Sequence, residues 1–155
     1  MSKFIFLLGD FILTLLFLSG SVYAEQTAKY TGTVYATPVK QLMPLGNGDS
    51  VLITQSTGIV AMSGDPPTIH ALSCSGMGLE KPDETTATNF YCNIKESAED
   101  SFDIKGTAGD ETGGKFDVIG GSGKWKGAAG KGKFVRVIQS DEGNKNVFEV
   151  EITVP

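Results

Sequence analysis

Apolar and polar residues alternate along several short segments of the chain, which is the pattern of half-buried β-strands. Phe116 and Val118 alternate with Lys115 and Asp117, and residues 147–152 repeat the pattern. Successive side chains of a strand point to opposite faces, so each such segment has one apolar face. No segment after residue 24 shows the sustained 3.6-residue period of an amphipathic helix. We therefore predict an all-β protein.

Clusters of Gly, Pro, Asn and Asp separate the candidate strands. The predicted strands are Lys29–Ala36, Ser50–Ala61, Thr68–Gly78, Ala87–Glu96, Ser101–Gly106, Gly114–Gly120, Gly130–Gln139 and Asn146–Val154, with Val39–Met43 as a short additional one. About eight short strands at regular spacing indicate a sandwich or a closed barrel. Closure would remove the sheet edges that invite aggregation, and an eight-stranded barrel can enclose side chains or one small ligand.

The first 24 residues have the organisation of a secretory signal peptide. Lys3 gives a positive start, an apolar run follows over Phe4–Leu18, and the small-residue pattern Val22-Tyr23-Ala24 ends the segment. The run is short for a bilayer span, and Asp10 interrupts it, although an uncleaved anchor remains the alternative. We predict cleavage after residue 24, a secreted or periplasmic location, and no stable membrane insertion afterwards.

Composition narrows the classes of function. Cleavage would leave 155 − 24 = 131 residues (25–155), enough for one domain with a single core. The net charge of −5 makes nucleic acid or an anionic membrane a poor partner. One histidine and two cysteines exclude a zinc site built from several such ligands. No Ser or Thr follows the Gly-Lys pairs as a phosphate-binding loop requires, and we predict neither a metal nor another cofactor.

The two cysteines predict a disulfide and, with it, a strand register. In an oxidising compartment two cysteines of one domain most often pair, and the residues 81–84 midway between Cys74 and Cys92 (KPDE) form a good turn. If the cysteines face each other across an antiparallel hairpin, the other facing pairs follow: Leu72 with Ile94, Gly76 with Phe90, and His70 with Glu96. All of these side chains share one face, and its apolar members mark it as the buried face.

His70 is the only histidine, so any catalysis that depends on histidine must use it. A facing Glu96 would orient the imidazole and raise its pKa, which makes the two residues candidates for a general acid–base pair. The alternative, which we favour, is a structural pair at the rim of the barrel.

The segment Gly113–Gly132 reads GGKFDVIGGSGKWKGAAGKG. Its Gly-Gly-Ser-Gly turn at 120–123, the aromatic Trp125 and the small residues 127, 128 and 130 resemble the signature of the allene oxide cyclase and dirigent barrels. The resemblance implies an eight-stranded antiparallel barrel with an apolar cavity. Members of these families act on, or orient, small hydrophobic oxidised molecules. The matching residues belong to the scaffold, so no catalytic residue is carried over.

Trp125 lies between two lysines and is interpreted as an inward anchor; an exposed platform for a sugar or base is the alternative. Arg136 would point inward with Phe134 and anchor a ligand carboxylate, but Val135 and Val137 favour the opposite register equally, so its direction stays open.

The hypothesis that follows is an exported barrel that binds a small hydrophobic molecule without turnover. The candidate ligand-contact residues are Arg136, Trp125, Phe90 and Leu72. A cofactor-independent isomerase or cyclase using His70, Glu96 or Arg136 is the first alternative, and a structural domain with a filled barrel is the second. The oligomeric state is left open.

Overall fold

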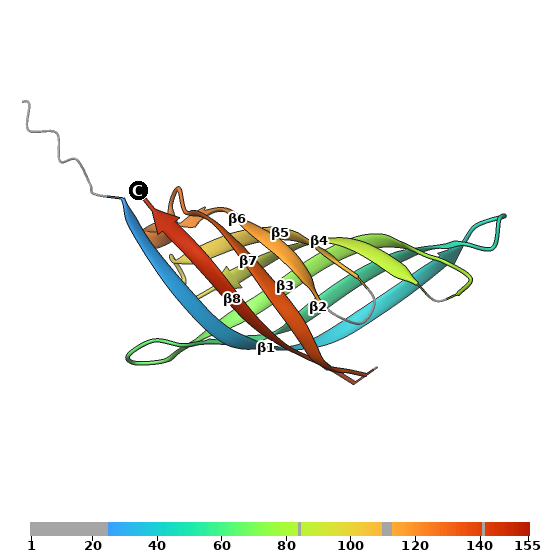
Figure 1. The fold of residues 1–155 in the computed structure, drawn as a ribbon, viewed down its shortest axis with the longest axis horizontal. Helices are drawn as coiled ribbons and strands as arrows, with labels where there is room; N and C mark the ends of the chain where they lie inside the picture. The colour runs from blue at the N-terminus through green and yellow to red at the C-terminus, as the bar shows by residue number, and fades with distance from the viewer. Residues whose placement is uncertain (1–24, 84, 110–112, 141) are drawn as a thin grey trace, which may run out of the picture.

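The structure, a computed structural model, describes residues 25–83, 85–109, 113–140 and 142–155; the predicted signal peptide lies outside them. Eight strands follow one another along the chain (Figure 1): β1 Gln26–Pro44, β2 Ser50–Met62, β3 Thr68–Glu80, β4 Thr86–Lys95, β5 Ser101–Ala108, β6 Gly114–Ser122, β7 Ala129–Gln139 and β8 Asn144–Val154. A 3₁₀ turn, η1 Gly123–Trp125, lies between β6 and β7.

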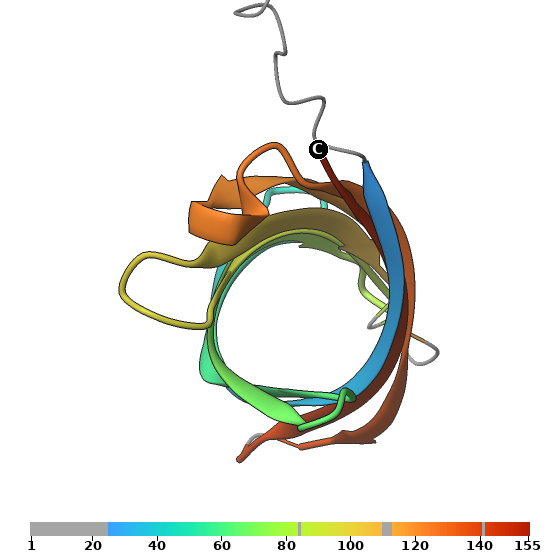
Figure 2. The same cartoon turned by 90° about the vertical axis from the view of Figure 1, so that its left-hand side faces the viewer.

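Each strand pairs antiparallel with its neighbour in sequence, and β8 closes the sheet by pairing with β1. The view along the molecule shows the strands as a closed ring (Figure 2). This confirms the predicted eight-stranded antiparallel barrel and excludes a sandwich. In the described part of the chain, no helix is long and apolar enough to cross a bilayer.

The strand β1 is longer than its sequence pattern predicts. Val39–Met43, expected as a separate short strand, is the continuation of β1, and pairs such as Leu42 with Leu52 extend the ladder with β2. Pairing between β1 and β8 stops at Ala36, so the rest of β1 has one neighbour only. A strand with one open edge accommodates Pro38, which has no N–H to give to a second neighbour.

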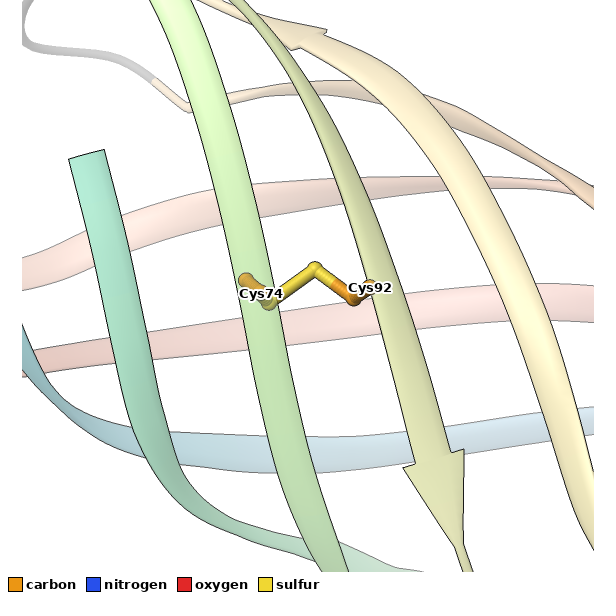
Figure 3. The surroundings of a disulfide bond; sticks show 2 residues. All are labelled: Cys74 and Cys92. Atoms are coloured by element: carbon orange, nitrogen blue, oxygen red, sulfur yellow. A yellow bond between two sulfur atoms is a disulfide. The ribbon is translucent and has the colours of Figure 1, made fainter. Parts of the chain in front are cut away.

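The predicted disulfide and register are confirmed. Cys74 on β3 is bonded to Cys92 on β4, as Figure 3 shows, and the two face each other in the ladder. The same ladder pairs Leu72 with Ile94 and Gly76 with Phe90. The pairing ends one step before His70 and Glu96 could meet, because β4 ends at Lys95.

The core fills only one half of the barrel. Side chains with even numbers face inward along most strands. Leu52 is buried towards the other end, whereas most buried members of the core lie towards the start of β1 and the end of β8: Val60, Met62, Leu72, Ile94, Phe102, Ile104, Val118, Trp125, Val150 and Ile152. Trp125 is 6% exposed and packs against Phe102 and Tyr30, with ring centroids 5.0 and 6.2 Å away. The prediction that Trp125 is an inward anchor is confirmed. We call the end of the barrel that contains Trp125 the closed end.

Candidate functional site

The half of the barrel opposite the closed end contains a cavity of about 970 Å³. Lys40 near the end of β1 and Glu80 at the end of β3 line it, together with Asp83 and Thr85 of the β3–β4 connection. The last two are exposed, so the cavity opens to solvent at this end, which we call the mouth.

Short lumen-facing side chains keep this half hollow. The positions that point inward near the mouth carry Thr54 and Ser56 on β2, Gly76 and Gly78 on β3, and Thr88 on β4. Farther along the same strands, the inward positions carry the large aliphatic side chains of the core. On β3 and β4 the lumen-facing positions are therefore mostly small towards the mouth and aliphatic farther in.

Four phenyl rings form an apolar band in the cavity wall, which we call the phenyl band: Phe90, Phe116, Phe134 and Phe148. The rings of Phe90 and Phe134 meet edge to face with centroids 5.8 Å apart. Both cysteines of the disulfide line the same wall. An apolar solute in the cavity would therefore contact aromatic carbon and disulfide sulfur.

Glycines on the neighbouring strands make room for the phenyl band. Gly132 faces Phe116 across the β6–β7 ladder, and a methyl group added to Gly132 would collide with that ring. Gly106 faces Phe90 in the same way, and an added Cβ would lie 2.5 Å from the tip of the ring. A glycine at these positions is required because the ring lies directly on its backbone.

Polar side chains line the cavity nearer the mouth. Arg136 faces Asn146 across the β7–β8 ladder, and both line the cavity with Asn144. Nη1 of Arg136 donates a hydrogen bond of 3.4 Å to the carbonyl oxygen of Gly109, and Arg136 has a further partner as well. The inward direction, left open by the sequence, is that of Phe134 and Arg136, which line the cavity, whereas Val135 and Val137 are exposed on the outer face.

The histidine lies at the closed end, away from this cavity. His70 is 3% exposed, its Nε2 is 2.8 Å from the hydroxyl of Thr68, and its buried Nδ1 has no hydrogen-bond partner among the described residues. Glu96 accepts hydrogen bonds from Nζ of Lys124 at 2.7 Å and from Nε1 of Trp125 at 3.2 Å. These two hydrogen bonds hold η1 against the end of β4.

Burial lowers the pKa of His70 below its ordinary value of 6.5 and outweighs the opposing effect of Glu96, so the expected rise is not found. Burial would raise the pKa of Glu96, but the hydrogen bonds from Lys124 and Trp125 leave that pKa below its ordinary value. Near neutral pH the pair is thus an uncharged imidazole and a carboxylate already held by two donors.

The structure separates the residues predicted to form the site. Arg136, Phe90 and Leu72 line the cavity, while His70, Glu96 and Trp125 are at the closed end and are not part of its lining. A catalytic role for His70 and Glu96 stays a prediction. Among the described residues, no three His, Cys, Asp or Glu side chains gather as a metal site would require.

Sequence reasoning missed Asn144, Asn146 and Phe148 as lining residues. A signal for them existed in the alternation along the last strand. Phe148 shares a face with two buried residues of β8, and extending that face back by two and four positions reaches both asparagines.

No family model and no curated protein matches the chain. Among solved structures, the chain is similar to the pterocarpan synthase dirigent protein GePTS1, with a TM-score of 0.55 and 8% sequence identity over 84% of this chain and 89% of that chain. The fold is dirigent-like. The likeness supports the dirigent part of the expected resemblance and says nothing specific of allene oxide cyclases. At this identity it shows the fold alone.

Proposed function

We propose that this protein is an exported barrel that binds a small hydrophobic molecule in its lumen without turning it over. The observation that carries the proposal is the cavity of about 970 Å³, lined by the phenyl band and the disulfide. Ligand sites typically have about 300–1,000 Å³, mostly apolar walls and a few placed polar groups. A purely structural domain with a filled barrel does not fit a cavity of this size.

The test uses N-phenyl-1-naphthylamine, an uncharged dye that fluoresces in apolar sites. The protein should bind the dye, and Ser56→Phe, which places a ring in the lumen, should abolish binding. Gln55→Phe is the matched control, because Gln55 is the exposed neighbour on the same strand. Lumenal binding would be refuted if the fluorescence of the dye did not change when the protein is added. It would also be refuted if Ser56→Phe bound the dye as well as the original protein does.

Export is the second part of the proposal. The disulfide is typical of proteins from oxidising compartments. N-terminal sequencing of the protein recovered outside the cytosol should begin at Glu25. A sequence that begins at Met1 would contradict cleavage.

A cofactor-independent isomerase or cyclase is the alternative function. It is favoured by the polar part of the lining, where Arg136 and Asn146 face each other inside the cavity. Such an enzyme would use these groups to orient a reactive oxidised substrate. Loss of turnover in Arg136→Gln, with dye binding retained, would support this alternative, whereas unchanged turnover would remove Arg136 from it.

A further inference from the structure

Polarity changes in one direction along the lumen on two strands, β8 and β4. From the mouth inward, β8 presents Asn146, Phe148 and Val150. The lumen-facing positions of β4 repeat this order, with Thr86 and Thr88, then the ring of Phe90, then Cys92 and Ile94. A molecule that matches this gradient has a polar head at the mouth and an apolar tail farther in.

Asn144 and Asn146 indicate which hydrogen-bonding groups the polar head of the ligand would carry. The Oδ1 atoms of Asn144 and Asn146 are shielded from water and have no hydrogen-bond partner among the described residues. A buried carbonyl oxygen without a donor is unfavourable, and most such atoms in proteins are paired. Because both amides line the cavity, a hydrogen-bond donor of an occupant that reaches these oxygens would satisfy them.

The charges of the lining argue against a charged head. The described lining residues include two bases, Lys40 and Arg136, and two acids, Glu80 and Asp83, so the cavity has no excess of either sign. The guanidinium of Arg136 already donates to the carbonyl oxygen of Gly109 and has another partner. A carboxylate bound at Nη1 would have to compete with the contact to Gly109.

We propose that the occupant is an amphiphile whose uncharged head donates hydrogen bonds, through hydroxyl or amide groups, to Asn144 and Asn146, while its tail lies on the phenyl band. This inference rests on the proposed function, since it concerns the same cavity. Asn146 and Val150 are four positions apart, which corresponds to about 13 Å of strand and sets the length of the tail.

Three probes with the same ten-carbon acyl chain separate the kinds of head: monodecanoylglycerol donates through two hydroxyl groups, methyl decanoate only accepts, and decanoate is anionic. Each is titrated, below its micellar concentration, against the bound naphthylamine dye. We expect monodecanoylglycerol to displace the dye at a concentration about tenfold lower than either of the others, as one or two additional hydrogen bonds would give.

The double variant Asn144→Leu/Asn146→Leu should lose this tenfold preference while still binding the dye and methyl decanoate. Asn89→Leu is the matched control, because Asn89 is exposed on the outer face of β4, and it should keep the preference. Preference for decanoate, equal displacement by all three, or a preference that survives in the double variant would overturn the inference. Absence of dye binding in the original protein would instead overturn the proposed function itself.

Discussion

Reduction of the disulfide between Cys74 and Cys92 should lower the free energy of unfolding by about 3 kcal/mol. The bond joins residues 18 positions apart, and in the chain-entropy account a ring of this size restricts the unfolded chain by that amount. For a folded part of about 130 residues, each kcal/mol corresponds to about 4 °C in Tm, so reduction should lower Tm by about 12 °C.

Urea unfolding of oxidised and reduced protein, followed by the fluorescence of the single tryptophan, measures this effect. The protein is reduced in denaturant and refolded with the reductant present, so that access to the bond does not limit the result. The midpoint should fall, and the dependence of the free energy on urea should steepen, because the reduced unfolded chain is more expanded.

The double variant Cys74→Ala/Cys92→Ala is the control, since its stability should not respond to reductant. If oxidised and reduced protein unfold at the same urea concentration with the same slope, the entropic reasoning is refuted. A lower midpoint with an unchanged slope would place the effect in the folded barrel and not in the unfolded chain.

Three further predictions concern the packing of the barrel. His70 has a lowered pKa in the folded state, so its contribution to stability is complete above pH 6.5 and is lost as the pH falls through the folded-state pKa. His70→Gln should therefore flatten the dependence of the unfolding midpoint on pH below pH 6.5, and an unchanged slope there would contradict this. Gly132→Ala should destabilise the protein by about 1–3 kcal/mol in urea unfolding because the added methyl group displaces the ring of Phe116, and a neutral effect would show that the ring moves without loss. Trp125→Ala should lower the free energy of unfolding by about 3–5 kcal/mol, measured by circular dichroism. Lys124→Ala removes a partly exposed ion pair and should change this free energy by less than about 1 kcal/mol. Similar losses in the two variants would refute the anchoring role of Trp125.

The hairpin of β3 and β4 shows what a sequence can specify. One constraint, the facing cysteines, fixed every other pair of the ladder, because a strand alternates its side chains with a period of two. The same logic fails at β7, where Phe134 and Arg136 lie on one face and Val135 and Val137 on the other. Both faces have apolar residues, so only the closed barrel decides which one points inward.

The position of a side chain along the barrel axis could not be predicted from the alternation of apolar and polar residues. Alternation places His70 and Phe90 on the same inward face, yet the first lies in the filled half and the second in the cavity wall. The difference depends on how eight strands are staggered around the barrel. The volume of the cavity likewise depends on how all lumen-facing side chains pack together, so no local sequence pattern predicts it.

The disulfide lies in the cavity wall, between the buried core residues of the β3–β4 hairpin and the mouth. On the β3–β4 ladder, Leu72 and Ile94 are buried core residues that also line the inner part of the cavity, and the cysteines lie between them and the pair Gly76–Phe90, which is nearer the mouth. Beyond that point β3 contributes glycines to the lumen, so the two strands lose the contacts that elsewhere hold the wall through a shared core. A covalent bond at this point compensates for the missing core, and it does so without filling the cavity. The same feature that would stabilise the barrel against unfolding therefore allows part of its interior to remain hollow.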